Sequence, residues 1–523
     1  MEALLPLNFK SFLFPQFMIP RFLSVIFLLI NMVVFSQEDA SMKKYAGLVK
    51  PDELKDNLTI LASDALEGRY TGSRGQKMAA AFIANHFREV GLVAPINGSY
   101  YQPIQLYSVA PGDSYLSVGT TRYENFSGML YMGNEETGAE IKTQIVFAGL
   151  GREEDLNQLD VNGKAVLFIM DKLSVAAMRQ LREPATLARE KGARYVFAAS
   201  SSPSDEFDLA VARLKGFLTP GELSLDRPGS TEEGNGIFYL QNSIAEKIFN
   251  TTFDKLKVAA NAEASKKMLK KVKPGSISFQ TSITTKTIQS ENVLGYLPGK
   301  DKIDELVIVT AHFDHIGKRS TGEGDVINNG ADDDGSGVVA VMQLAKAFAQ
   351  AKKDGVGPRR SILFMTVTGE EEGLFGSEHY VSNPIFPLAS TVVDLNIDMI
   401  GRIDEKYKDN KNYVYVIGAD KLSSELHNLN ERLNKTYTHL EFDYTYNDQN
   451  HPERLYYRSD HWNFARNGIP IIFFFDGIHE DYHKVTDEVS KIDFELLALR
   501  AQAVFYAAWE IANKEDRLVV DKK

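Results

Sequence analysis

The sequence predicts an α/β protein with a mixed, mostly parallel central sheet flanked by helices and a smaller inserted α+β domain. Three observations lead to this prediction. After residue 276, apolar runs alternate with helical patterns, an order typical of a parallel sheet covered by helices. Between residues 112 and 272 the pattern changes to short strands around a helix. The chain has 523 residues, more than the roughly 100–200 residues of one typical domain.

The main domain is expected to begin with two helices and to continue as a series of buried strands. Residues 51–92 space their apolar side chains as two helices do, on either side of the glycine-rich loop 66–75. That loop is either a substrate-facing edge or, as its composition favours, a plain connection. The later elements are expected in this order: strands at 277–279, 293–297 and 306–310, a helix over 337–351, a strand at 362–367, a helix from Gly376 and a strand at 469–475.

The inserted region has a strand order of its own. Apolar strands are predicted at 145–149, 163–170 and 195–199, with a helix over 185–191 before the last of them. This order resembles the protease-associated domain, a module often inserted into exopeptidases. An ordinary α+β insertion without a separate role is the alternative interpretation.

The N-terminus has the form of a secretory signal. Arg21 precedes an apolar run over residues 22–35, and the sequence becomes polar at Gln37, before which we expect cleavage. The protein is therefore expected to be exported to the periplasm or the extracellular space. A retained membrane anchor is less favoured, because the run is shorter than the ~20 residues of a bilayer span. Initiation at Met18 rather than Met1 would give a signal of more ordinary length.

Composition excludes several classes of function. The net charge is −12 and no long basic run occurs, so nucleic acid is not an expected partner. The chain has no cysteine, which excludes disulfides, thiolate metal ligands and cysteine nucleophiles. Nothing in the sequence specifies an oligomeric state.

Histidines and acids follow the predicted strands where those strands end, which is where open α/β sheets place their sites. Within these motifs, Asp314 and Asp487 lie close enough in sequence to orient His312 and His483. The five motifs are, in chain order, 311–315, 329–337, 369–377, 396–401 and 482–487.

Each motif alone has a structural explanation, such as a core histidine for His312 or a helix N-terminus for Asp333. Two of them are harder to explain without a cation. The adjacent acids Glu370 and Glu371 repel each other unless a cation or proton compensates. Asp398 lies in an apolar stretch, where an unpaired carboxylate is costly. Two imidazoles with several carboxylates suit zinc, with cobalt or manganese as substitutes.

Together the motifs resemble the co-catalytic zinc aminopeptidases related to bacterial leucyl aminopeptidases, glutamate carboxypeptidase II, transferrin receptor and glutaminyl cyclase. The resemblance covers residues 290–490 and implies the zinc exopeptidase fold, with Glu370 as general base. It also implies that Tyr456, three residues before the motif Ser459-Asp460-His461, supports the tetrahedral intermediate, with Tyr457 as an alternative. In relatives, the peptide bond between the residues that match Asp333 and Asp334 is cis, and the same feature here would mark a functional site. The ligands implied for two Zn²⁺ ions are His312, Asp333, Glu371, Asp398 and His483, with Asp333 bridging.

The function implied by the resemblance is that of an exported metallo-aminopeptidase, a hydrolase that removes N-terminal residues from peptide substrates. A non-catalytic receptor-like binding protein is one alternative, and glutaminyl cyclase is another. Animal-type glutaminyl cyclases work with one zinc, whereas this chain keeps both histidines and all three acids. A carboxypeptidase of the same fold would need a basic pocket, for which Arg454, Arg458 and Arg466 are candidates.

The expected organisation has five parts. These are a signal peptide at 1–36, the first part of the catalytic domain at 37–111, the inserted protease-associated-like domain at 112–272, the metal-binding part of the catalytic domain at 273–515, and a tail at 516–523. After cleavage of the signal peptide, no stable membrane anchor is expected.

Overall fold

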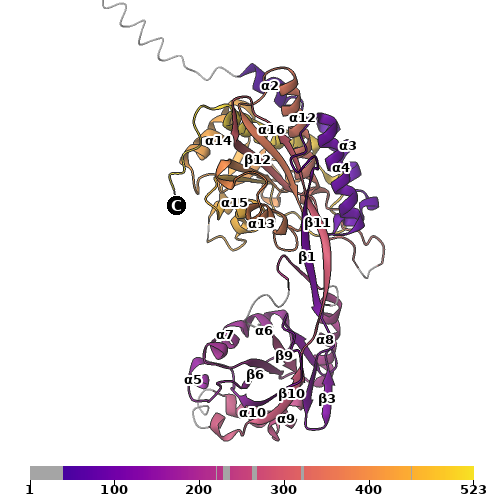
Figure 1. Ribbon diagram of the computed structural model, residues 1–523, viewed down its shortest axis with the longest axis vertical. Coiled ribbons are helices and arrows are strands. Elements are labelled where there is room, and N and C mark those ends of the chain that lie inside the picture. The colour runs from indigo at the N-terminus through magenta and orange to yellow at the C-terminus, as the bar shows by residue number, and fades with distance from the viewer. Residues whose placement is uncertain are drawn as a thin grey trace, which may run out of the picture.

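The computed structural model describes residues 39–218, 221–227, 236–261, 268–319, 323–448 and 450–522. The expected signal peptide therefore lies outside the described residues. The chain forms two units, each built around its own sheet, and a long two-stranded ribbon joins them (Figure 1). Within the described residues, no helix is both long enough and apolar enough to cross a bilayer.

The larger unit contains a mixed sheet of nine strands among the described residues, in the order β16-β15-β17-β14-β12-β13-β11-β1-β8. The neighbours β17, β14, β12 and β13 are parallel, whereas β11, β1 and β8 are antiparallel. This confirms the predicted mixed α/β fold. The strands are β1 Tyr101–Pro111, β8 Glu222–Ser224, β11 Ile283–Leu297, β12 Lys302–His312, β13 Arg360–Val367, β14 Thr391–Ile397, β15 Tyr413–Ile417, β16 Glu441–Asp443 and β17 Ile471–Phe475.

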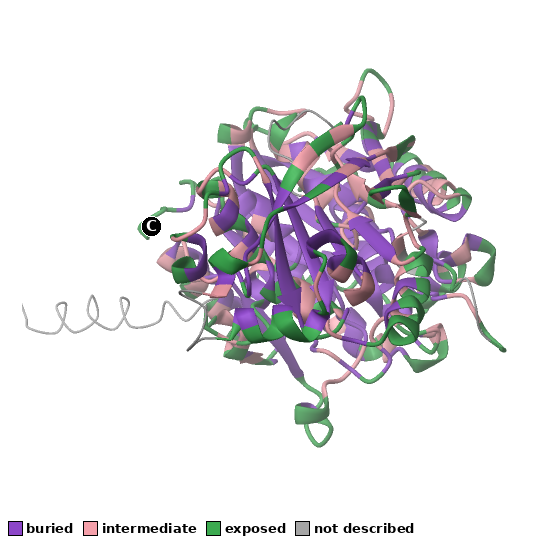
Figure 2. Ribbon diagram, turned by 90° about the horizontal axis from the view of Figure 1, so that it is seen from below, coloured by how far each residue is buried: buried purple, intermediate pink, exposed green. Residues whose placement is uncertain are grey.

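Helices cover both faces of this sheet because its strands are apolar on both sides. Along β12, Val307 and Val309 join one apolar core, while Leu306 and Ile308 join the other. Buried strands accordingly occupy the centre of Figure 2, with exposed residues on the surrounding helices and turns. The first core includes α2 Ala40–Ala46, α3 Pro51–Leu61, α4 Arg74–Val90, α12 Gly337–Lys353, α14 Ser424–Tyr437 and α16 Phe494–Asn513; the second includes α13 Phe375–Ser382 and α15 His461–Ala465.

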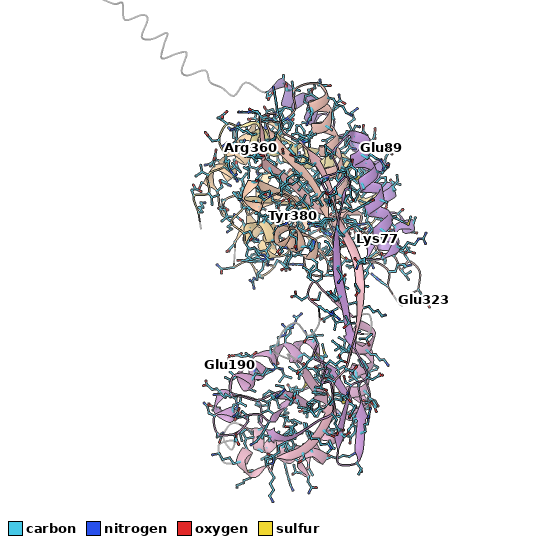
Figure 3. The ribbon with its side chains drawn as sticks, in the orientation of Figure 1. Lys77, Glu89, Glu190, Glu323, Arg360 and Tyr380 are labelled. Carbon is cyan, nitrogen blue, oxygen red and sulfur yellow. The ribbon has the colours of Figure 1, made fainter. Side chains whose placement is uncertain are left out.

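Local signals fix the ends of α4, one of the two helices predicted in residues 51–92. Ser73 accepts a hydrogen bond from the backbone N–H of Gln76 at its start, and Gly91 ends it with φ 90°. Lys77, labelled in Figure 3, forms an ion pair with Glu291 of β11. The helix is thereby attached to the ribbon that leads to the second unit.

The smaller unit contains a sheet in the order β3-β2-β10-β5-β6-β7-β9-β4. Its core is aromatic: Phe197 stacks on Phe238 with ring centroids 4.5 Å apart, and Phe279 meets both rings edge-on. The strands are β2 Tyr115–Val118, β3 Thr121–Glu124, β4 Met129–Met132, β5 Ile141–Phe147, β6 Ala165–Met170, β7 Tyr195–Ser200, β9 Ile237–Leu240 and β10 Gly275–Gln280, and the helices are α5 Glu153–Leu156, α6 Val175–Gln180, α7 Arg182–Glu190, α8 Ser204–Leu218, α9 Asn242–Phe249 and α10 Phe253–Ala260.

Two strands differ from the expected division of the chain. The strand predicted at 277–279 was expected to return the chain to the main domain, but it lies in β10, which pairs with β2 and β5 of the smaller sheet. Conversely, β8 comes from within the range 112–272 and pairs with β1 of the larger sheet. Alternating apolar residues predict a strand but do not specify its partner, which is why the strand at 277–279 was assigned to the wrong sheet. The short strand β8 was not predicted at all.

Candidate functional site

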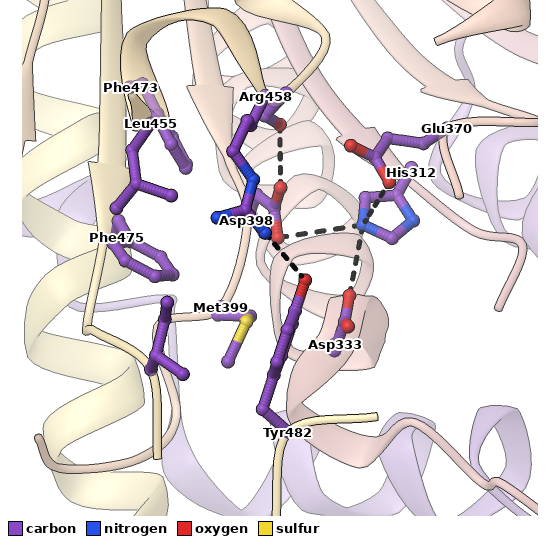
Figure 4. Close-up of a pocket in the computed structure, with 12 residues that line it drawn as sticks. His312, Asp333, Glu370, Asp398, Met399, Leu455, Arg458, Phe473, Phe475 and Tyr482 are labelled. Carbon is purple, nitrogen blue, oxygen red and sulfur yellow. Dashed lines mark hydrogen bonds and ion pairs between the residues drawn. The ribbon is translucent and has the colours of Figure 1, made fainter. Parts of the chain in front are cut away.

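The predicted residues meet where the parallel strands of the larger sheet end. His312 is the last residue of β12, Asp398 directly follows β14, and Glu370 follows β13 by three residues. Neighbouring parallel strands end at one edge, so their following residues lie close together. They line a pocket, shown in Figure 4. Its lining residues are His312, Asp333, Glu370, Asp398, Met399, Leu455, Arg458, Ser459, Phe473, Phe475, Ile478 and Tyr482.

The five predicted ligands form two groups that share Asp333. In the first group, His312 Nε2 lies 3.2 Å from Asp333 Oδ1 and 3.6 Å from Asp398 Oδ1. In the second, His483 Nε2 lies 3.1 Å from Asp333 Oδ2 and 3.0 Å from Glu371 Oε2. Each carboxylate oxygen of Asp333 thus faces a different histidine. This is the arrangement expected of a carboxylate that bridges two cations.

Two other side chains have donor atoms close to these groups. Asp334 lies with His312 and Asp398, and His315 lies with Asp333 and Glu371. The carboxylate of Asp334 already accepts hydrogen bonds from the backbone N–H groups of His312, Gly337 and Met399. It therefore shapes the site rather than facing into it.

His315 is a site residue to which the sequence reasoning assigned no role. Its Nδ1 lies 2.7 Å from Glu371 Oε1, which leaves Oε2 of the same carboxylate facing His483. His315 therefore orients Glu371. Its position three residues after His312, at the end of the same strand, was the signal that could have identified it.

The nitrogen and oxygen atoms of these side chains are better suited to bind divalent cations than to form hydrogen bonds with one another. Although His483 Nε2 and Asp333 Oδ2 are in contact, neither has a partner in hydrogen-bond geometry among the described residues. Burial lowers the pKa of His483, but Asp333 and Glu371 raise it to about 10. Burial also raises the pKa of Glu370 well above its ordinary value. A buried group of acids with this much uncompensated charge is a suitable site for metal ions.

Asp314 and Asp487, the two acids predicted to orient the histidines, both lie at the site, but their carboxylates bind backbone N–H groups rather than the histidine rings. Asp314 accepts hydrogen bonds from Thr71 Oγ1 at 2.9 Å and from the backbone N–H of Glu370 at 3.2 Å. Its carboxylate is 3.9 Å from His312 Nδ1, which instead lies 3.1 Å from the backbone oxygen of Asp314. The expectation that the Asp314 carboxylate itself orients His312 is therefore wrong.

Asp487 holds the segment that carries the bridging residue. Its carboxylate accepts hydrogen bonds from the backbone N–H groups of Asp332 and Asp333, at 3.0–3.1 Å. The peptide bond between Asp333 and Asp334 is cis. Asp487 therefore positions Asp333, whereas the sequence led us to expect that it orients His483.

The loop 66–75 braces the site, although its composition favoured a plain connection. The guanidinium group of Arg69 is fully buried and donates to the carbonyl oxygens of Phe313 and Asn329 at 2.8 and 2.6 Å. It also donates to the carbonyl oxygens of Leu61 and Gly330. One side chain thus connects the segment after β12 with the segment that leads to Asp333.

The structure does not place Tyr456 at the pocket. It lies in the short 3₁₀ helix Leu455–Tyr457, where its buried ring packs against Tyr457 and Trp462. Tyr482, next to His483, lines the pocket instead, and its hydroxyl lies 3.5 Å from Arg458 Nη2. The sequence reasoning placed this tyrosine wrongly, because spacing from the Ser459 motif does not show which ring faces the metals.

The three arginines that could bind a substrate carboxylate lie in different places. Arg458 lines the pocket and forms an ion pair with Glu453 at 3.1 Å. Arg454 lies over the ring of Tyr457, and Arg466 pairs with Glu378. Arg458 is the candidate that reaches the site.

Comparison with known proteins relates this site to a family of peptidases. Residues 292–508, which carry all of the candidate ligands, match the family described as "Peptidase family M28". Aminopeptidase YwaD of Bacillus subtilis is 28% identical over 242 residues, or 45% of this chain and 47% of that protein. A probable leucine aminopeptidase of Trichophyton verrucosum is 29% identical over 227 residues, or 42% and 57%. The chain spans about half the length of these curated relatives.

A solved structure of an aminopeptidase from Aneurinibacillus sp. strain AM-1 has the same fold. It superposes with a TM-score of 0.53 at 20% identity and covers 92% of this chain and 98% of that one. The likeness extends over both units, because neither unit alone reaches this coverage.

Proposed function

We propose that this protein is a zinc-dependent aminopeptidase that releases N-terminal residues from peptides. The observation that carries the proposal is the pair of ligand groups that share Asp333, with Glu370 beside them in the same pocket. The match of residues 292–508 to peptidase family M28 supports the reaction class, and the names of the aminopeptidase relatives support the kind of peptidase.

Glu370 is the proposed general base. When bound, two zinc ions would polarise the scissile carbonyl group and increase the acidity of the attacking water. Glu370 takes the proton of that water on a side-chain carboxylate oxygen and passes it to the leaving amine. Burial raises the pKa of Glu370, which suits a carboxylate that must hold the proton between these two steps. The hydroxyl of Tyr482 is placed to donate to the oxyanion.

The pocket indicates which N-terminal residues fit. Leu455, Phe473 and Phe475 lie on one side of the pocket (Figure 4), Ile478 also lines it, and these apolar side chains favour an apolar substrate side chain. The opposite side carries the carboxylates, which favour a free ammonium group. We therefore expect peptides with an unblocked, apolar N-terminal residue to be preferred.

Metal analysis combined with a panel of substrates tests the proposal. The purified protein should contain about two zinc ions per chain, as expected of a co-catalytic site. It should cleave leucyl and phenylalanyl substrates and leave their N-acetylated forms intact. The assignment would be rejected if the protein cleaved only the blocked substrates, or if it kept its full activity after the removal of zinc.

A carboxypeptidase is the second candidate, because Arg458 lies in the pocket and could bind a terminal carboxylate. Its pairing with Glu453 makes this the weaker candidate. Amidation of the substrate C-terminus separates the two functions: a carboxypeptidase loses the substrate, whereas an aminopeptidase still cleaves it.

We also propose that the protein is exported after cleavage before Gln37. The proposal rests on Arg21, the apolar run 22–35 and the change to polar sequence at Gln37. Mass spectrometry of the mature N-terminus tests it, and an intact Met1 or Met18 in the exported protein would contradict it.

A further inference from the structure

A stripe of polar side chains runs along a buried strand toward the site. Asp394, Asn396 and Asp398 are two residues apart on and just after β14, so they share one face. The residues that alternate with them, Val393, Leu395 and Ile397, belong to the apolar core on the other face. Asp394 and Asn396 are 0% exposed. Buried polar groups are costly unless they are hydrogen-bonded, so their contacts need an explanation.

These side chains form a continuous chain of contacts that ends at a predicted ligand. Thr310 Oγ1 of β12 lies 2.9 Å from Asp394 Oδ1 and 2.7 Å from Asn396 Oδ1. Asn396 Nδ2 lies 2.9 Å from Ser459 Oγ, and Ser459 Oγ lies 2.6 Å from Asp398 Oδ2. The other carboxylate oxygen of Asp398 faces His312.

The number of available protons fixes the direction of every link. A metal ligand is ionised, so Asp398 accepts and the single hydroxyl proton of Ser459 points to it. Ser459 must then accept from the amide nitrogen of Asn396. The carbonyl oxygen of Asn396 therefore faces Thr310 and takes the single hydroxyl proton of that residue. Thr310 therefore has no proton left to donate to Asp394. The contact between them is a hydrogen bond only if Asp394 carries a proton and donates it to Thr310.

We infer that Asp394 is a neutral carboxylic acid that starts a one-way hydrogen-bond relay, through Thr310, Asn396 and Ser459, which positions the metal ligand Asp398. This relay rests on the proposed function in one respect, because it takes Asp398 to be an ionised metal ligand. All four links donate in the same direction, so each one polarises the next. Asp394 and Thr310 are positioning residues, since neither lines the pocket.

The surroundings of Asp394 agree with a neutral acid. Within the part of the chain that the structure describes, its Oδ2 has no hydrogen-bond partner, and the same is true of the buried hydroxyl of Tyr380, which is labelled in Figure 3. Among the described residues, the ionisable groups that act on Asp394 are Asp460 and Tyr380, and neither is a cation. Burial raises the pKa of Asp394 well above its ordinary value, and Asp460 raises it further. A hydrogen bond donated by Thr310 would lower this pKa, but in the relay Thr310 donates to Asn396 instead.

Infrared difference spectra of Asp394→Asn against the wild-type protein at neutral pH test the protonation state. The variant should lose one C=O band of a protonated carboxyl group and no carboxylate band. Loss of a carboxylate band instead would show that Asp394 is ionised and would overturn the inference. This result does not depend on zinc or on activity.

Zinc titration against a competing chelator tests the relay. Thr310→Val removes the hydroxyl group at nearly constant shape, and it should weaken one of the two zinc sites by about tenfold or more. Thr310→Ser keeps the hydroxyl group and should bind both ions as the wild-type protein does. Ser459→Ala removes the last link without altering β12 and should have the same effect as Thr310→Val.

The outcomes separate the relay from the proposed function. Wild-type zinc affinity at both sites in Thr310→Val and Ser459→Ala would overturn the relay and leave the proposed function standing. If the wild-type protein bound no zinc, the proposed function would be wrong, whereas the infrared spectra would still decide the state of Asp394.

Discussion

The two sheets of this protein are built alike but carry different chemistry. Both contain neighbouring parallel strands that are buried at their carboxyl ends, β12 and β13 in one, β6 and β7 in the other. In the larger sheet, the residues after these strands are histidines and acids that meet in one pocket. The insertion 112–272 contains no histidine at all. A parallel strand end thus provides a location, and the residue types that follow the strand make it a site.

The two units are also held together differently. Around the site, buried charges such as Arg69 and Asp487 bind backbone groups and fix the ligand segments. In the smaller unit, aromatic rings around Phe197 provide the core. Changes at the site should therefore alter chemistry, and changes in the smaller core should alter stability. The following changes test this contrast, from the largest expected effect on the site to the smallest.

Glu370→Gln should lower kcat by about 10²–10⁴-fold, because only the proton acceptor is removed. Zinc content should stay the same, as measured by metal analysis of the purified variant. Glu372→Gln is the matched control: it removes the same charge two residues away, outside the pocket lining, and should keep wild-type kcat. Wild-type turnover by the Glu370→Gln variant would show that Glu370 is not the general base.

Tyr482→Phe should lower kcat by about 10²-fold, the usual cost of one lost oxyanion donor. Tyr456→Phe should leave kcat unchanged, since Tyr456 packs in the core and does not line the pocket. Steady-state kinetics on a leucyl substrate compare the two variants. The reverse order of effects would restore the role that the sequence suggested for Tyr456.

Arg69→Met should weaken zinc binding by about 10–100-fold, because the ligand segments lose the side chain that connects them. Arg360→Met is the matched control. Arg360 is also fully buried and binds the backbone oxygens of Ile511 and Lys514, far from the ligands in sequence and outside the pocket lining. Both variants should unfold at a lower temperature, but only Arg69→Met should change the chelator titration.

Zinc affinity should rise with pH. His483 has a pKa of about 10 in the metal-free protein and is protonated below that value, whereas zinc binds the neutral imidazole. Each displaced proton should therefore increase affinity by about tenfold per pH unit up to that pKa. Calorimetry in buffers of different ionisation enthalpy counts the released protons. A pH-independent affinity would show that His483 is not a ligand.

Phe197→Ala should have the smallest effect on the site and a large effect on the smaller unit. Removal of the stacked ring should cost about 3–5 kcal/mol of unfolding free energy. Zinc content and kcat on a single aminoacyl substrate should remain those of the wild-type protein. A parallel loss of zinc during thermal unfolding of this variant would mean that the two units do not unfold separately.

Much of the fold followed from the sequence because its signals are local. Apolar runs predicted β12, β13 and β17, and helical spacing predicted α4 and α12. Strand partners were not predictable in the same way. The residues of β10 and β8 predict no particular neighbour, and the antiparallel ribbon of β1 with β11 pairs Tyr101 with Val293 at one end and Pro111 with Ile283 at the other, far apart in the sequence.

The sequence by itself determined the order of ligand motifs, and with it the grouping of His312, Asp333 and His483. Only the tertiary structure decided how the surrounding side chains are used. Arg69, His315 and Asp394 are ordinary residues in the sequence, and the resemblance suggested Tyr456, with Tyr457 as the alternative, where the structure brings Tyr482 to the pocket. Their roles depend on which atoms they meet across the fold, and neither spacing nor residue type fixes such contacts. Ligand types are set by metal chemistry, whereas bracing contacts are set by geometry.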